Sequence, residues 1–308
     1  MAENGGIAAT RRVVIGGASG MIGSAVAAAL RARGDTVHRL VRRAEIQEPD
    51  EIWWNPVENT IDDVALQGAD VVLHFGGRSL DARWAEPVKQ EIRQSRVRST
   101  RLLAETVAKL DRKPSTLLVV SATGFYGDRD DEVLEETSAR GHGFLADVVV
   151  AWEAAADPAR EAGIRVIHPR CAPVLSERGG ALARMLPVFR LGAGGTLGDG
   201  RQWFSWIALD DLVRAVEWLL DESALDGAVN VSSPEPVTNA EFTEVLGRVL
   251  HRPTVTRAPE FALRLVYGEM ADEMLFTSQR VVPRRLLNAG FRFAYPKLED
   301  ALRHILDS

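Results

Sequence analysis

The 308-residue chain contains a single cysteine, Cys171, and six histidines scattered along its length. One cysteine excludes a framework of internal disulfides, and scattered histidines do not provide the ligand spacing of a zinc site. No apolar run reaches the length of a membrane span, and residues 1–11 lack the apolar core of a secretory signal. We therefore expect a cytoplasmic protein that has no resident metal and does not bind membranes.

The chain also lacks an excess of positive charge. Its formal net charge is -6, and the basic residues do not gather into a stripe. Proteins that bind nucleic acid normally present such a basic surface, so nucleic acid is not an expected partner. Hydrophobic residues make up 46% of the chain and charged residues 26%, which is typical of a globular protein with a substantial core.

What the sequence does contain is a glycine-studded turn near its start. Residues 12–23 read RVVIGGASGMIG, an apolar run followed by glycines and then by a helical pattern. A strand, a glycine turn and a helix in this order are typical of dinucleotide-binding sites, although glycines also end strands for structural reasons. Phosphates would lie at the helix N-terminus. The predicted cofactor contacts here are Gly17, Ser19, Gly20, Met21, Ile22 and Gly23.

Strand and helix patterns then alternate along the chain. Apolar runs predict strands at residues 36–41, 51–54, 70–74, 117–120 and 164–168, and helical spacing predicts helices at 84–110, 143–162, 210–221 and from 238 onward. This order predicts an α/β fold, a Rossmann-type doubly wound parallel sheet with a smaller, mainly helical C-terminal substrate lobe. The predicted cofactor domain is 11–175, with 203–232 returning to it, and the predicted lobe is 176–202 and 233–308.

The end of the second predicted strand indicates which dinucleotide binds. About 20 residues after the glycines, an acidic residue would hold the ribose 2′-hydroxyl of NAD, whereas arginine accommodates the 2′-phosphate of NADP. This chain has Arg42 and Arg43 at that point and no acid. A solvated strand end is the other interpretation, but the pattern favours NADP(H) as the cofactor.

Residues that follow other strands extend the predicted cofactor site. Asn55 is positioned either to hydrogen-bond the adenine or to form an Asx turn before proline. We interpret His74 as a packed strand-end histidine, and the glycines of the HFGG motif at 74–77 let the backbone approach the cofactor. The contacts predicted from these strand ends are Asn55, Phe75, Gly76, Gly77 and Arg170.

Polar side chains after the fifth predicted strand are the catalytic candidates. Ser121, Thr123 and Tyr126 lie in the segment SATGFYGD, just beyond a strand end, where a doubly wound sheet places its chemistry. Ser121 would polarise a carbonyl beside the nicotinamide and contact the cofactor, or it would form an ST turn. Tyr126 is either an acid or stacking group, or an ordinary buried aromatic residue.

Two further stretches carry expectations about exposed surfaces. The helix predicted at 84–110 contains arginines at 93, 96, 98 and 101, most of which should form a solvated face. The glycine-rich segment GAGGTLGDG at 192–200 predicts a loop over the active cleft. Beside it we expect Arg201, Gln202 and Trp203 to contact substrate, and we interpret Trp206 as a core residue.

Longer motifs resemble a known family. They are GGASGMIG at 16–23, HFGG at 74–77, SATGFYGD at 121–128, FLADVVVAWEAAA at 144–156, GGTLGDGRQWFSWIALDDLVRA at 194–215 and GEMADEMLFTSQRVVPRRLLNAGFRFAYPKLEDAL at 268–302. The chain resembles the extended short-chain dehydrogenases/reductases of the epimerase/dehydratase type, in the atypical branch called epimerase family proteins, which end in a domain of unknown function. The resemblance implies an oxidoreductase or epimerase-like enzyme acting on a small polar substrate. It also implies a monomer, or a homodimer formed through the helices at 95–110 and 144–162.

The catalytic pair that this resemblance implies is missing. Extended members place a lysine four residues after a tyrosine, where the lysine lowers the tyrosine pKa and holds the nicotinamide ribose. None of the four lysines follows a tyrosine at that spacing, and the matching helix has Phe144, Leu145, Val148 and Val149 instead. Two hypotheses stay open: an enzyme with another proton source, and a catalytically silent NADP(H)-binding redox sensor or scaffold. The retained glycine turn and the elaborate substrate side favour the enzyme.

Overall fold

The structure, a computed structural model, describes residues 10–43 and 45–307. Within these residues the central sheet has nine strands in the order β14-β9-β6-β5-β1-β2-β3-β4, with β7 paired to β9. Its pairs are parallel except for antiparallel β3 and β4. The strands are β1 (Arg12–Gly16), β2 (Thr36–Val41), β3 (Glu51–Asn55), β4 (Thr60–Ile61), β5 (Val71–His74), β6 (Thr116–Val119), β7 (Ser121–Ala122), β9 (Arg165–Cys171) and β14 (Gly227–Val231). The predicted Rossmann-type α/β fold is confirmed.

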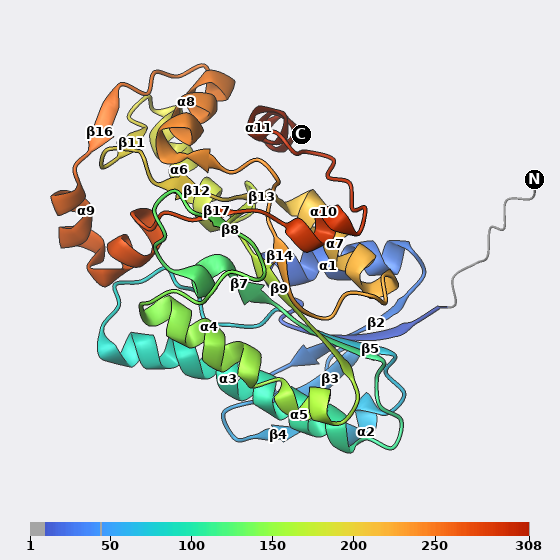
Figure 1. The fold of residues 1–308 in the computed structure, drawn as a ribbon. Coiled ribbons are helices and arrows are strands. Elements are labelled where there is room, and N and C mark those ends of the chain that lie inside the picture. Colours follow the sequence, from blue (N-terminus) through green and yellow to red (C-terminus); the bar gives the residue numbers. More distant parts are fainter. Residues whose placement is uncertain (1–9, 44, 308) are drawn as a thin grey trace, which may run out of the picture.

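Both faces of the sheet are covered by helices, which explains the continuous apolar run in β1 (Figure 1). Successive side chains of a strand point to opposite faces. Val13 and Ile15 pack with α1 (Met21–Ala32) and α7 (Leu209–Asp221). Val14 packs on the other face, where α3 (Glu86–Lys109), α4 (Phe144–Ala154) and α5 (Asp157–Glu161) lie.

The helix predicted at 143–162 is two helices, α4 and α5. Pro158, in the first turn of α5, has no amide hydrogen to donate to the carbonyl of Ala154, so one continuous helix would lose a hydrogen bond there. The helix predicted at 84–110 begins at Glu86, with Pro87 in its first turn, where a missing amide hydrogen is tolerated. Among the described helices, none combines the length and the apolar character that a membrane span requires.

The C-terminal part of the chain forms a lobe with its own apolar core (Figure 1). Trp206 is fully buried there with Phe242 and Leu246, so the prediction that Trp206 is a core residue is confirmed. The helices of this part are α6 (Gly180–Arg190), α8 (Asn239–Leu250), α9 (Glu260–Tyr267), η2 (Ala271–Leu275), α10 (Arg284–Asn288) and α11 (Leu298–Leu306). The short elements of the sheet region are α2 (Asp63–Leu66) and η1 (Thr123–Tyr126).

The glycine-rich segment at 192–200 is built into this lobe and is not a free loop. Its middle forms β11 (Gly195–Leu197), which pairs with β16 (Thr256–Ala258), and the Leu197 amide donates to the side chain of Asn239. The prediction of a loop over the cleft is therefore wrong for this part. The remaining short strands are β8 (Val133–Leu134), β10 (Val174–Leu175), β12 (Trp203–Phe204), β13 (Ile207–Ala208), β15 (Val237–Thr238) and β17 (Arg280–Val281).

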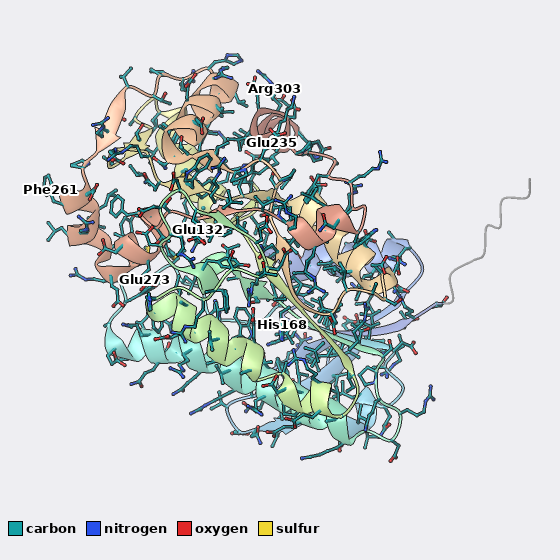
Figure 2. All side chains as sticks on the ribbon, viewed as in Figure 1. Glu132, His168, Glu235, Phe261, Glu273 and Arg303 are labelled. Atoms are coloured by element: carbon teal, nitrogen blue, oxygen red, sulfur yellow. The ribbon has the colours of Figure 1, made fainter. Side chains whose placement is uncertain are left out.

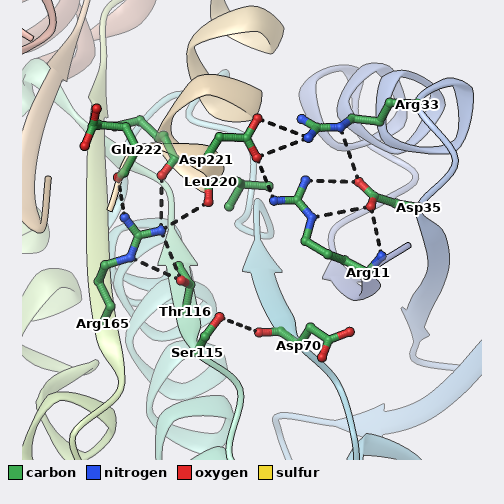
Figure 3. A network of polar contacts seen from close by, with 11 residues as sticks. Arg11, Arg33, Asp35, Asp70, Ser115, Thr116, Arg165, Leu220, Asp221 and Glu222 are labelled. Carbon is green, nitrogen blue, oxygen red and sulfur yellow. Dashed lines mark hydrogen bonds and ion pairs between the residues drawn. The ribbon is translucent and has the colours of Figure 1, made fainter. Parts of the chain in front are cut away.

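Paired charges fasten the amino edge of the sheet (Figure 3). Arg11, which precedes β1, binds Asp35 at 3.1 Å and Asp221 at 2.9 Å, and Arg33 binds Asp221 at 3.0 Å. Arg165, the first residue of β9, donates to carbonyl oxygens at and beyond the end of α7. Helix α7 is thereby held to the starts of three strands, and the opposite, carboxyl edge is left for a ligand.

Candidate cofactor and substrate site

The turn between β1 and α1 is tight on one side and open on the other. Gly17 has a φ of +80°, and a Cβ atom at this position would lie 2.6 Å from the amide nitrogen of Gly76. At Gly23 a Cβ would overlap the carbonyl group of Gly17. Both positions therefore require glycine. A Cβ at Gly20 would meet only the Gly17 carbonyl oxygen, at 3.4 Å, so contacts within the protein do not explain this glycine.

Helix α1 begins at this turn without a cap. Gly20 precedes it, no side chain of the described residues accepts a hydrogen bond from its first amides, and its first turn contains no acidic residue. The first amides of a helix have no partner within the helix and carry its positive dipole end. Ser19 and Gly20 are exposed, and Met21 and Ile22 are half-buried beside them. The geometry of this turn fits a phosphate group.

The HFGG segment lies against the turn, as the Gly17–Gly76 contact shows. The Phe75 amide donates to the Gly16 carbonyl at 2.8 Å, which continues the pairing of β1 and β5 beyond the strands. Gly77 is exposed, and a Cβ there would lie 3.1 Å from the guanidinium carbon of Arg96. The two glycine segments predicted to contact the cofactor are therefore neighbours in space.

His74 is packed beneath this segment, as predicted. Its ring is fully buried, its Nε2 lies 2.8 Å from the hydroxyl of Ser99, and it lies against Gly16 and Gly76. Burial, together with the nearby positive charge of Arg96, lowers the pKa of His74 to about 4. The histidine is therefore neutral at physiological pH and supports the backbone around it.

The two arginines after β2 differ in their partners. Arg43 forms an ion pair with the buried carboxylate of Glu51 and donates to the Glu45 carbonyl at 3.2 Å. Glu51 also accepts the amide of Gln47, so it organises the whole loop after β2. Arg42 is exposed and has neither an ion pair nor a hydrogen bond within residues 10–43 and 45–307. Of the two, Arg42 has the guanidinium that is available to a 2′-phosphate.

Asn55 forms the Asx turn that the sequence allowed. Its side-chain oxygen accepts the amides of Val57 at 3.1 Å and Glu58 at 3.4 Å. Only its amide nitrogen is left for an adenine.

The catalytic candidates lie in the interior. Tyr126 is fully buried, and Ser121 and Thr123 are each 3% exposed. The Tyr126 hydroxyl donates to Asn230 at 2.7 Å and accepts from Arg170 at 3.3 Å. Burial raises the pKa of Tyr126, so this phenol is a poor proton donor or acceptor at neutral pH.

Arg170 and Ser121 share a buried carboxylate, Glu153. Arg170 binds Glu153 with two hydrogen bonds, at 2.9 and 2.8 Å, and the Ser121 hydroxyl donates to the same carboxylate at 2.6 Å. Burial alone would raise the pKa of Glu153, but the bonds from Arg170 and Ser121 outweigh it and hold this pKa below its usual value. Arg170 and Ser121 thus both hold the carboxylate of Glu153 in place.

Apolar side chains occupy the first turns of α4, where the resemblance implies the Tyr/Lys pair. A Cβ at Gly124 would lie 3.3 Å from Leu145 and 4.0 Å from Val149, so both side chains face η1. Phe144 meets Trp84 edge to face, with ring centroids 5.3 Å apart. Lys89 lies over the Phe144 ring but is held by Glu269 at 2.8 Å. No charged group in the described residues replaces the pair at these helix positions.

A cavity of about 220 Å³ lies between η1, the beginning of α4 and η2. Glu273 of η2 caps α4, since its two carboxylate oxygens accept the amides of Phe144 at 2.8 Å and Leu145 at 3.0 Å (Figure 2). Leu145 gives its lining an apolar side chain, and most of the other lining side chains carry hydrogen-bonding groups, which suits a small polar molecule. The lining residues that bear on its chemistry are Gly124, Asp128, His142, Leu145, Glu273 and Gln279.

The predicted substrate residues do not line this cavity. The Arg201 side chain is 88% exposed and pairs with Asp199 at 2.6 Å. The Gln202 amide donates to the carbonyls of Leu197 and Leu275. Trp203 stacks with the guanidinium of Arg280, 4.2 Å from the ring centroid. Sequence reasoning missed His142 and Glu273, because the cavity joins segments that are distant along the chain; the acidic pair in the motif GEMADEML was the available signal.

Comparisons with known proteins agree with this geometry. Residues 13–232 match the NAD dependent epimerase/dehydratase family, and residues 258–305 match a domain of unknown function, DUF1731. An epimerase family protein of Mycobacterium bovis is 45% identical over 291 residues, which are 94% of this chain and 96% of that protein. The mouse epimerase family protein SDR39U1 is 35% identical over 300 residues, 96% of this chain and 99% of that protein.

Solved structures give the same result. The crystal structure of human epimerase family protein SDR39U1 with NADPH superposes with a TM-score of 0.88 at 32% identity, covering 96% of this chain and 99% of that one. A UDP-glucuronic acid 4-epimerase from Bacillus cereus, in complex with NAD, shares the fold at 16% identity, with a TM-score of 0.75 over 96% of this chain and 97% of that one. The family resemblance inferred from the motifs is confirmed. The chain belongs to the NAD dependent epimerase/dehydratase family, among the epimerase family proteins with a C-terminal DUF1731 domain.

Proposed function

We propose that this protein is an NADP(H)-dependent oxidoreductase or epimerase-like enzyme that acts on a small polar substrate in the cavity beside Gly124 and Leu145. The observation that carries the proposal is Gly20, whose missing side chain leaves space above an uncapped helix N-terminus. The human relative crystallised with NADPH adds support. When bound, the nicotinamide of this cofactor supplies or accepts a hydride.

Each part of the cofactor has candidate contacts. We assign the diphosphate to the turn from Gly17 to Gly23 and to the HFGG segment, and the 2′-phosphate to Arg42. The amide nitrogen of Asn55 is available to the adenine. Ser121 and Arg170 are not assigned to a part of the cofactor, because both are buried and bound to Glu153. The cofactor domain is then 11–175 with 203–232, which contains β14, and the substrate lobe is 176–202 with 233–308.

Proton transfer is assigned to the cavity wall. Tyr126 is buried, and Leu145 and Val149 carry no exchangeable proton. Among the titratable side chains that line the cavity, Glu273 is used to cap α4. His142, which is exposed, lines the same cavity as Asp128, and one carboxylate oxygen of Asp128 accepts the Ser278 amide. We assign proton exchange with substrate or water to His142 and Asp128.

The alternative is a catalytically silent NADP(H)-binding redox sensor or scaffold. The apolar residues Leu145 and Val149 at the positions of the missing pair favour it. A panel of carbonyl compounds, offered to the protein with NADPH, separates the two functions. Oxidation of NADPH that depends on one of the compounds supports the enzyme, whereas binding of NADPH without any turnover supports the silent module.

The cofactor assignment is tested by titrating NADPH and NADH into the wild-type protein and two variants. Because charge-assisted hydrogen bonds each contribute about 1.5–3 kcal/mol, wild type should bind NADPH at least about tenfold more tightly than NADH. Arg42→Ala should remove this preference. Arg43→Ala, the matched control, should keep most of it, since Arg43 is paired with Glu51. Equal or tighter binding of NADH by wild type would overturn the assignment.

A further inference from the structure

Arg96 is a guanidinium without a counter-charge at the edge of the proposed cofactor site. It is half-buried on α3, whereas Arg93, Arg98 and Arg101 are exposed, as predicted for most of this run. Its Nη1 donates to the Ile92 carbonyl at 3.0 Å, and its guanidinium carbon lies 5.2 Å from the centroid of the Trp152 ring. No carboxylate in residues 10–43 and 45–307 forms an ion pair with it.

The HFGG segment is fastened to α3 around this arginine. The hydroxyl of Ser95 accepts the amide of Arg78 at 2.9 Å, and the hydroxyl of Ser99 lies 2.8 Å from the buried ring of His74. Between these two attachments, Arg96 lies against Gly77, where a Cβ would come within 3.1 Å of its guanidinium carbon. The position of the guanidinium under Gly77 is therefore fixed by contacts on both sides.

An unpaired cation in this place is unfavourable for the protein alone. Taking a charge out of water costs free energy unless an opposite charge compensates, and burial lowers the pKa of Arg96 to about 10. The neighbouring histidine gives no compensation because it is neutral. The other ion pairs of α3, such as Lys89 with Glu269, lie elsewhere on the helix. A bound anion would supply the negative charge that Arg96 lacks within the described residues.

We propose that Arg96 is a cofactor-anchoring residue whose guanidinium faces the diphosphate of bound NADP(H). The inference rests on the proposed function. We assign the diphosphate as this anion because of two contacts. Arg96 lies against Gly77, and the preceding residue, Gly76, lies against Gly17 in the turn that we assign to the diphosphate. Arg42 and Arg96 then hold different parts of one cofactor, the 2′-phosphate and the diphosphate.

Three ligands of increasing length test this division: adenosine 2′-phosphate, 2′-phospho-ADP-ribose and NADPH, each titrated by calorimetry. Only the second and third contain phosphates of the diphosphate. Arg96→Gln should weaken both by about 10- to 100-fold, and should change adenosine 2′-phosphate by less than about threefold. Arg42→Ala should weaken all three ligands. Arg98→Gln, on the same helix and exposed, is the matched control and should bind all three as wild type does.

A structural role for Arg96 predicts a different result. The unliganded Arg96→Gln protein should be at least as thermally stable as wild type, because an uncompensated charge has been removed, while the stabilisation by NADPH should shrink. Arg96→Lys, which keeps the charge, should recover part of the affinity. Unchanged NADPH affinity in Arg96→Gln, or an equal loss for adenosine 2′-phosphate, would overturn the proposal. Failure of wild type to bind NADPH at all would instead overturn the proposed function.

Discussion

The two edges of the central sheet treat charge in opposite ways. At the amino edge, Arg11 and Arg33 are both matched with carboxylates of Asp35 or Asp221 at about 3 Å. At the carboxyl edge, within the described part of the chain, Arg42 and Arg96 have no carboxylate partner, and helix α1 begins uncapped. Because a charge that is partly removed from water is costly without a counter-charge, the unpaired Arg96 indicates that the carboxyl edge takes its partner from outside.

The largest expected effect comes from filling the open space at the carboxyl edge. Gly20→Val would place a branched side chain above the first amides of α1 and should weaken NADPH binding by about 1,000-fold or more. The fold should survive, because the one close contact that the described residues make with a Cβ at that position is at 3.4 Å. Ala28→Val, on an exposed position of the same helix, is the control. An NADPH affinity within a few-fold of wild type would show that the cofactor does not occupy the space beside Gly20.

A smaller effect is expected from His74, which supports the carboxyl edge as a neutral group. Its pKa is about 4 when folded and 6.5 in the ordinary state, so the unfolded chain binds a proton that the native protein does not. Its contribution is therefore present above pH 6.5 and is lost as the pH falls from 6.5 toward 4, by about 3 kcal/mol.

Urea unfolding of wild type and His74→Gln at pH 7 and pH 4.5 measures this contribution. Glutamine keeps a polar group near Ser99 but does not titrate. The free energy of unfolding should fall more steeply for wild type than for the variant over this pH range. Parallel losses in the two proteins would show that His74 is not the group that senses pH.

The smallest of these effects belongs to the amino edge. Asp35→Asn should lower the free energy of unfolding by about 2 kcal/mol, because Arg11 and Arg33 lose a buried carboxylate and keep only the exposed Asp221. NADPH affinity should not change. The same measurement on Arg42→Ala should give the reverse, with stability within about 0.5 kcal/mol of wild type and a loss of NADPH affinity. Equal losses of stability in both variants would remove the contrast between the edges.

Local pattern was enough to predict the frame of the site. The apolar run before Gly17 and the helix from Met21 are read from neighbouring residues, and so is the packed state of His74 at the end of a buried strand. The predicted boundaries were less accurate where a proline intervened, as at Pro158.

Contacts between distant segments could not be predicted. The choice between Arg42 and Arg43 depends on Glu51, which faces Arg43 only after β3 has paired with β2. Arg96 is an exception that helical spacing alone could have found. It lies four residues after the buried Ile92 and three before the buried Ser99, which places it on the inner side of α3.

The cap that Glu273 places on α4 has a consequence for how the protein is made. Phe144 and Glu273 are 129 residues apart, and synthesis proceeds from the N-terminus. The turn from Gly17 to Gly23 and the strands β1 and β5 beside it will have left the ribosome long before Glu273 is added to the chain. A growing chain can therefore form a place for the cofactor early, but it completes the wall of the substrate cavity only after Glu273 has been added. Ribosome-bound intermediates would hold nucleotide without being able to enclose a substrate.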